Sequence, residues 1–135
     1  MVRLADWEQR LHGYLTGLAG RGFTWGRLDC ALFAAGAVMA ITGEDPAAAF
    51  RGRYRTARGS VRALRRFGAG TLEATIAAQF EDRPAAFARR GDLALVAGEL
   101  GPMVGVVIGA DALFIGDDGF ERRPRADWSR CWSVG

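Results

Sequence analysis

The feature that most constrains this sequence is an uncharged run from Cys30 to Gly43 that directly follows Asp29. The run is shorter than the roughly 20 apolar residues of a membrane span, so we expect a helix buried inside a soluble domain. Aspartate is a preferred N-cap residue because its carboxylate accepts backbone N–H groups of the first turn, and glycine commonly ends a helix. The run therefore predicts a central buried helix that begins at Cys30.

Cys30 has two interpretations on this stretch alone. A cysteine in the first turn lies at the positive end of the helix dipole, a setting in which the thiol pKa falls and a reactive thiolate forms. An unpaired cysteine is also among the most buried residue types and often behaves as a small hydrophobic side chain. Cys30 is therefore a candidate nucleophile, although a structural cysteine is the more common case.

The chain has 135 residues and two cysteines, Cys30 and Cys131. This length is enough for one domain, 1–135, to bury a core without metal ions or disulfides, and we predict no metal and no cofactor. Two cysteines without CxxC spacing favour free thiols in a reducing compartment, with pairing between them as the alternative. The charged N-terminus does not resemble an export signal, so we expect synthesis in the cytoplasm and no membrane insertion.

The rest of the chain predicts further helices and then strands. Apolar residues between Trp7 and Leu18 recur with helical period. Ser60 is expected to cap a later helix, and Thr71 to begin another that ends at Arg83-Pro84. After Gly91, apolar stretches alternate with glycine-rich turns, which predicts antiparallel strands at 93–96, 103–108, 112–115, 120–122 and 130–134. Helices followed by strands predict an α+β domain whose C-terminal antiparallel sheet packs on the central helix.

Arginine is unusually concentrated in one part of the chain. All 18 basic residues are arginine, and residues 51–66 hold seven of them and no acid. A helix face rich in arginine is typical of nucleic-acid or acidic-partner sites, and the candidate binding residues are Arg58, Arg62 and Arg65. No aromatic residue lies on this face, as single-strand binding would require. We therefore favour a solvated helix face over a nucleic-acid site.

Three motifs together resemble the NlpC-type branch of the papain-like cysteine peptidases. They are Phe23-Thr24-Trp25-Gly26 followed by Asp29-Cys30, then Gly91-Asp92, then Val104-Gly105-Val106-Val107-Ile108-Gly109. The peptidases carry a Trp-Gly…Asp-Cys nucleophile motif, then Gly-Asp, then a His-Val-Gly-Ile-like strand. The resemblance implies a papain-like α+β fold in which Trp25, Gly26, Gly91, Asp92 and Gly105 are motif residues.

The same resemblance implies that two catalytic roles are vacant. In the peptidases a histidine on the second strand takes the thiol proton, and a polar residue on the third strand orients it. The resemblance places Met103 and Ile115 at these positions, and neither side chain accepts a proton. Asp29 and Asp92 are alternative carboxylate bases if their pKa rises well above the usual value of about 4. His12, the only histidine, is expected to be a boundary residue of the first helix.

A narrower resemblance covers most of the chain. Phe23 to Phe33, with Thr42 to Pro46 and Phe50 to Tyr54, is similar to an uncharacterised family encoded among tail genes of phages, prophages and gene-transfer agents. It implies an inactive, NlpC-like virion component that assembles into a tail tip or baseplate, with hub and baseplate proteins as partners. Tryptophan and arginine are enriched at interfaces, so the expected partner surface comprises the arginine stretch and exposed members of Trp7, Trp128 and Trp132.

Two other functions stay open. One is a thiol-dependent hydrolase of peptidoglycan that uses Cys30 as nucleophile, with the backbone N–H at the helix start contributing to an oxyanion hole. The other is a nucleic-acid-binding module that acts through Arg51–Arg66, whose affinity would fall steeply with salt.

Overall fold

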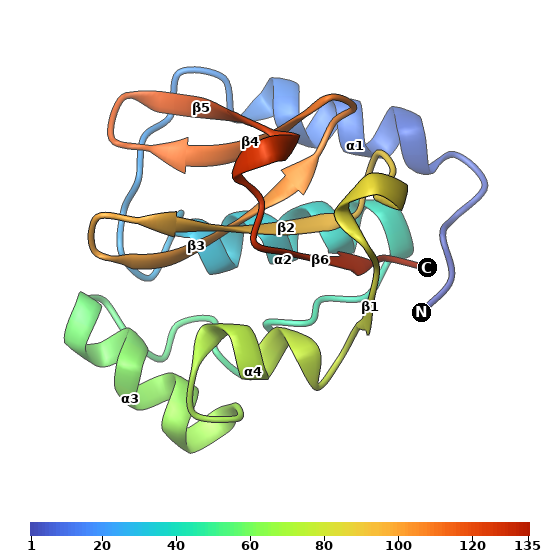
Figure 1. Cartoon of the computed structure of the whole chain (residues 1–135). Coiled ribbons are helices and arrows are strands. Elements are labelled where there is room, and N and C mark those ends of the chain that lie inside the picture. The colour runs from blue at the N-terminus through green and yellow to red at the C-terminus, as the bar shows by residue number, and fades with distance from the viewer.

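The computed structural model describes residues 1–135 and has an α+β fold (Figure 1). The helices α1 (Trp7–Gly17) and α2 (Cys30–Thr42) come first, followed by α3 (Ala57–Phe67) and α4 (Leu72–Ala77). Every strand but the two-residue β1 (Glu81–Asp82) lies after residue 92. The predicted order of helices and then antiparallel strands is confirmed.

The sheet has six antiparallel strands in the order β1-β6-β2-β3-β4-β5. Four consecutive strands pair as hairpins: β2 (Leu93–Gly98), β3 (Gly101–Val107), β4 (Asp111–Gly116) and β5 (Gly119–Pro124), with β5 at one edge of the sheet. The last strand, β6 (Arg130–Ser133), returns to pair with β2, and β1 pairs with its outer edge. The sequence did not predict β1, because Glu81 and Asp82 are both exposed and show no apolar alternation.

The central helix forms as expected from its ends. The Asp29 side chain accepts a hydrogen bond of 3.0 Å from the Leu32 N–H, and Gly43 ends α2 with a φ of 82°. Phe33, Val38 and Ile41 are fully buried within α2. None of the helices is long and apolar enough to cross a membrane.

Strand alternation divides the sheet residues between two cores. On the face toward α1 and α2, Leu93, Val104 and Trp132 belong to the larger cluster, which also contains Leu11 and Phe33. The opposite face holds a smaller cluster of Ala88, Ala94, Val96, Val107, Ala112, Phe114, Trp128 and Cys131. Successive residues of a strand point to opposite faces, so register decides which core each side chain joins.

The third and fourth helices lie together on the lower side of the domain, away from α1 (Figure 1). The helix expected to begin at Thr71 is present, with Thr71 as its cap, since its hydroxyl accepts the Ala74 N–H at 3.1 Å. It ends at Ala77, earlier than the expected end at Arg83-Pro84. The expectation that Ser60 caps α3 is wrong. Thr56 is the cap, accepting the Gly59 N–H at 3.0 Å, because extended backbone at Thr56 places the helix start one turn earlier.

Candidate functional site

The residue before Cys30 organises the loop that leads into α2. Asp29 is buried, with 1% of its surface exposed. Its Oδ1 accepts the Leu32 N–H at 3.0 Å, and its Oδ2 accepts both the Gly26 N–H at 3.0 Å and the Tyr54 hydroxyl at 2.5 Å. With both oxygens engaged, Asp29 serves as a structural carboxylate rather than a free base.

The Trp25-Gly26 pair fits this loop closely. Gly26 has a φ of 78°, and a Cβ built on it would lie 2.1 Å from the Tyr54 carbonyl oxygen. Only glycine meets both conditions. The Trp25 ring packs edge-on against Phe23, with ring centroids 4.8 Å apart.

Cys30 lines an apolar groove of about 650 Å³, which we call the Cys30 groove. One wall comes from α2 and the other from α3 and α4, with Val104 of β3 and the tip of the β2–β3 hairpin completing it. Of its 28 lining residues 19 are hydrophobic, and the charged ones are Asp29 and Arg65 alone. Trp25 and Tyr54 also line the groove.

The thiol of Cys30 is electrostatically unsuited to ionise at neutral pH. Burial raises the pKa of Cys30, and the neighbouring Asp29 carboxylate adds to this rise. Backbone amides of Val104, Ala31 and Cys30 itself lower the pKa without outweighing burial. Of the two interpretations of Cys30, the structural cysteine therefore fits its surroundings better, because loss of water opposes the thiolate more strongly than the first-turn amides favour it.

Neither of the expected replacement residues faces the thiol from the groove. Met103 packs in the smaller core, on the sheet face away from α2, while Val104 lies on the Cys30 side. The placement of Met103 opposite Cys30 is therefore off by one residue, and a single step along a strand reverses the face. Ile115 is 2% exposed inside the larger core and does not line the groove. His12 is exposed on α1, likewise outside the groove.

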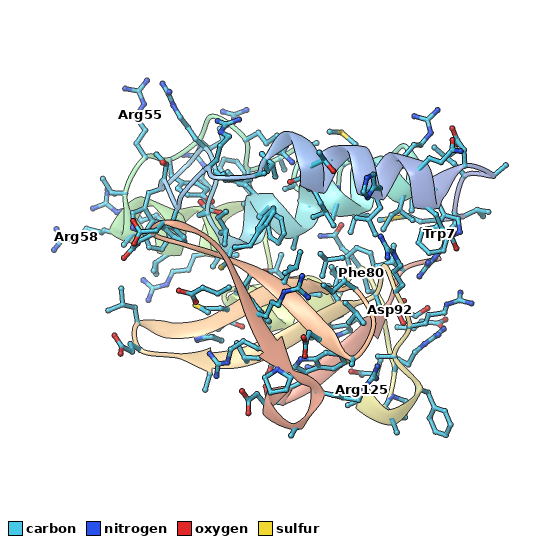
Figure 2. All side chains as sticks on the ribbon, turned by 90° about the horizontal axis from the view of Figure 1, so that it is seen from above. Trp7, Arg55, Arg58, Phe80, Asp92 and Arg125 are labelled. Atoms are coloured by element: carbon cyan, nitrogen blue, oxygen red, sulfur yellow. The ribbon has the colours of Figure 1, made fainter.

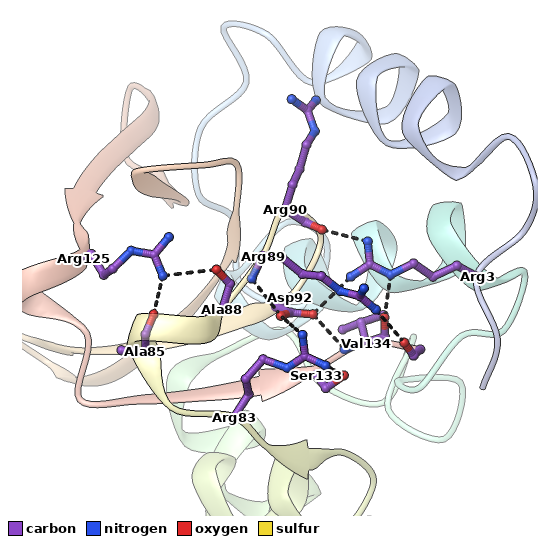
Figure 3. A network of polar contacts seen from close by, with 11 residues as sticks. Arg3, Arg83, Ala85, Ala88, Arg89, Arg90, Asp92, Arg125, Ser133 and Val134 are labelled. Carbon is purple, nitrogen blue, oxygen red and sulfur yellow. Dashed lines mark hydrogen bonds and ion pairs between the residues drawn. The ribbon is translucent and has the colours of Figure 1, made fainter.

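Asp92 belongs to a separate network that joins the two ends of the chain (Figure 3). Its Oδ1 accepts hydrogen bonds of 3.1 Å from Arg3 Nη2 and from the Val134 N–H. Its Oδ2 accepts the Arg89 N–H at 2.9 Å and lies 3.5 Å from Arg83 Nη1. Asp92 is fully buried and does not line the Cys30 groove, so its role as an alternative base is not supported.

The other two motif glycines allow close approaches. Gly91 has a φ of 93°, and a Cβ there would lie 2.9 Å from Arg3 Nη1. A Cβ on Gly105 would lie 2.2 Å from the Leu113 carbonyl oxygen of the neighbouring strand. Both glycines therefore serve the packing of the sheet and its termini.

The arginine face of α3 is open to solvent. Arg58, Arg62 and Arg65 are exposed and belong to none of the ion pairs of the structure. Figure 2 shows Arg55 and Arg58 projecting away from the body of the molecule, at the end opposite Asp92. Of the three candidate residues only Arg65 also lines the Cys30 groove.

The expected tryptophan surface is largely absent. Trp132 is fully buried in the larger core and Trp128 is 7% exposed in the smaller one. Trp7 is partly buried beneath the Arg3 guanidinium, which lies 4.3 Å from its ring centroid. Cys131 is buried on the sheet face opposite Cys30, and both cysteines are free.

Sequence reasoning missed two parts of this site. One is Tyr54, whose hydroxyl engages Asp29 and whose only signal is an aromatic residue within the arginine-rich motif Phe50 to Tyr54. The other is the wall that α3 and α4 contribute to the groove. Their apolar residues Leu64, Leu72 and Ile76 indicate a buried face, but not that a groove lies in front of it.

No curated protein matches the chain. Residues 2–134 match the family described as Domain of unknown function (DUF6950). Because this match spans nearly the whole sequence, including the Asp29-Cys30 loop, the groove and the Asp92 network, the chain belongs to that family.

Proposed function

We propose that this chain is a catalytically inactive NlpC-type domain with a papain-like fold, acting as a structural or assembly component of a phage-like tail tip or baseplate. The observation that carries the proposal is the setting of Cys30. Cys30 is the first residue of α2, the position that the motif resemblance assigns to the nucleophile, and it lines a groove that no histidine lines.

The chemistry around the thiol supports an inactive domain. The pKa of Cys30 is raised by burial, so the thiol stays protonated at neutral pH. The nearest carboxylate, Asp29, is held by Leu32, Gly26 and Tyr54. Loss of a general base costs roughly 10²–10⁴-fold in rate. A hydrolase built on Cys30 alone would therefore be very slow.

The exposed surface supports an assembly role. The arginines of α3 have no ion-pair partner within the chain, so they are available to acidic residues of a hub or baseplate protein. The motif resemblance to proteins encoded among tail genes is the reason for proposing a tail tip or baseplate as the assembly.

The experiment is a complementation test in a phage, prophage or gene-transfer agent that encodes the chain. Deleting the gene should stop tail assembly, the tagged chain should be found in purified particles, and Cys30→Ala should restore assembly as well as the wild type does. Normal particles without the chain would refute the assembly role.

A peptidoglycan hydrolase is the second candidate, favoured by the one observation that Cys30 lines a groove beside backbone amides. A turbidity assay on purified peptidoglycan compares the wild type with Cys30→Ser. We expect no clearance by either protein. Clearance that disappears in Cys30→Ser would replace the inactive domain with an enzyme.

A nucleic-acid-binding module is the remaining candidate, favoured by the unpaired arginines of α3. Titration of duplex and single-stranded DNA at increasing salt tests it directly. Steeply salt-dependent binding that is lost in the triple variant Arg58→Glu, Arg62→Glu, Arg65→Glu would establish this function in place of assembly.

A further inference from the structure

We propose that the Cys30 groove binds an anionic amphiphile, a ligand with one long alkyl or acyl chain and a single acidic head group held by Arg65. This inference rests on the shape and charge of the groove and not on the proposed role in tails.

The size and lining of the groove suit a small apolar ligand. Its volume of about 650 Å³ falls within the range of roughly 300–1,000 Å³ that is typical of ligand sites. The α2 wall presents the small side chains of Ala31, Ala34 and Ala35, and larger apolar residues of α3 and α4 lie opposite. Small residues on one wall leave space that the other wall does not fill, and such apolar space accepts apolar ligands.

The charge of the groove selects the head group. Asp29 and Arg65 are its only charged lining residues, and three hydrogen bonds within the chain already engage Asp29. Arg65 is exposed and has no carboxylate partner within the chain. The one lining charge without a partner is therefore the positive charge of Arg65, and Arg58 and Arg62 on the same helix strengthen the positive potential at the groove. A ligand with an acidic end gains a charge-assisted hydrogen bond there.

The mouth of the groove places apolar and basic groups side by side. Leu100, at the tip of the β2–β3 hairpin, is 97% exposed, and Val61 of α3 is 46% exposed, although both line the groove. Val61 and Arg65 are four residues apart on α3 and so are neighbours on the helix surface. An alkyl chain that enters beside Val61 and Leu100 would cover both side chains and leave its head group at Arg65.

The test is isothermal titration of the full chain with dodecanoate, tetradecanoate and hexadecanoate below their micelle concentrations. We expect one ligand per chain, with affinity rising about fourfold for each added methylene until the groove is full, the factor that corresponds to about 0.8 kcal/mol. Dodecanol, which has the same chain without the charge, should bind about tenfold more weakly. Dodecyltrimethylammonium should bind no better than dodecanol.

Two variants locate the site. Arg65→Gln should weaken dodecanoate binding about tenfold and leave dodecanol binding unchanged, whereas Arg21→Gln, which removes an exposed arginine outside the groove, should change neither. Leu100→Asp should weaken both ligands, and its exposed position makes a folding defect unexpected. Thermal unfolding of each variant checks that the fold is retained.

Three results would overturn the inference. The first is absence of binding by every alkyl probe, which would mean that the groove binds a peptide or no ligand at all. The second is equal affinity for the carboxylate and ammonium probes, or wild-type affinity in both Arg65→Gln and Leu100→Asp. The third is cosedimentation with phosphatidylglycerol vesicles without binding of free dodecanoate, which would indicate adsorption to a membrane surface instead of a site for a single chain.

Discussion

The Tyr54 hydroxyl donates a hydrogen bond of 2.5 Å to Asp29 Oδ2 across 25 residues of sequence. The same oxygen accepts the Gly26 N–H at 3.0 Å. This bond therefore ties the segment after α2 to the loop before α2, while the other oxygen of Asp29, Oδ1, caps the helix through the Leu32 N–H. The carboxylate of Asp29, next to the Cys30 thiol, is therefore fully engaged in structural hydrogen bonds.

Replacing Tyr54 by phenylalanine should lower the free energy of unfolding by about 1.5–3 kcal/mol, the range for hydrogen bonds to charged groups. Tyr14→Phe is the matched control, because the Tyr14 hydroxyl donates a hydrogen bond of 2.8 Å to the uncharged Phe33 carbonyl oxygen. Its cost should be smaller, about 0.5–1.5 kcal/mol. Urea unfolding of both variants measures the difference. Equal costs would show that the Asp29 bond carries no charge-assisted contribution.

Alkaline pH should destabilise the fold through its tyrosines. Burial raises the pKa of Tyr14 from 10.0 to about 12, and burial together with the Asp29 carboxylate raises the pKa of Tyr54 even further. Since the folded pKa values exceed the unfolded ones, this stability is fully present below about pH 10 and is lost as pH rises through about 12 for Tyr14. Unfolding midpoints across this range should fall less steeply in Tyr54→Phe. An unchanged slope in that variant would contradict the assignment.

The Gly26 position should tolerate no side chain. Gly26→Ala places a Cβ 2.1 Å from the Tyr54 carbonyl oxygen at a φ of 78°. Gly20→Ala is the control, because Gly20 has nearly the same φ, 79°, with no atom within 4 Å. Backbone strain alone should cost about 1–3 kcal/mol in both variants, and the clash should make Gly26→Ala clearly worse. Similar denaturation midpoints for the two proteins would rule out the close approach.

Asp92 should matter far more to stability than an exposed aspartate does. Asp92→Asn leaves Arg3 without its buried charge partner, and breaking buried ion pairs costs about 3–5 kcal/mol. Asp82→Asn removes a similar pair with Arg130 at the surface, where solvent screens the charges, so we expect little change. Thermal unfolding of the two variants compares them. The inverse order of stabilities would show that the terminal network is dispensable.

The Cys30 thiol should react slowly at neutral pH. Its pKa is raised from the ordinary value of 9.0 by burial, so the thiolate fraction stays small until the pH exceeds about 9. In the Cys131→Ser variant, which leaves Cys30 as the only thiol, iodoacetamide should modify the folded protein more slowly than the urea-unfolded protein. Faster modification of the folded protein would indicate an activated thiolate and would favour the hydrolase over the inactive domain.

The sequence by itself determined the elements that depend on near neighbours. Helix α2 starts after Asp29 and ends at Gly43 as predicted. Both signals are local, because an N-cap side chain and a C-terminal glycine with positive φ each act within one turn of the helix. Apolar alternation likewise indicated the strands from Leu93 onward. The α+β order followed from these local signals.

Only the tertiary structure decided which side chains meet. Register placed Val104 and not Met103 on the Cys30 side, and the pairing of β6 with β2 carried Trp132 into the core. The Tyr54–Asp29 bond likewise depends on how the chain returns after α2. Caps and periodicity depend on residues within a few positions of one another. Burial of the Cys30 thiol and the groove beside it depend on strand pairing and on the placement of α3 and α4, which join residues far apart in the chain.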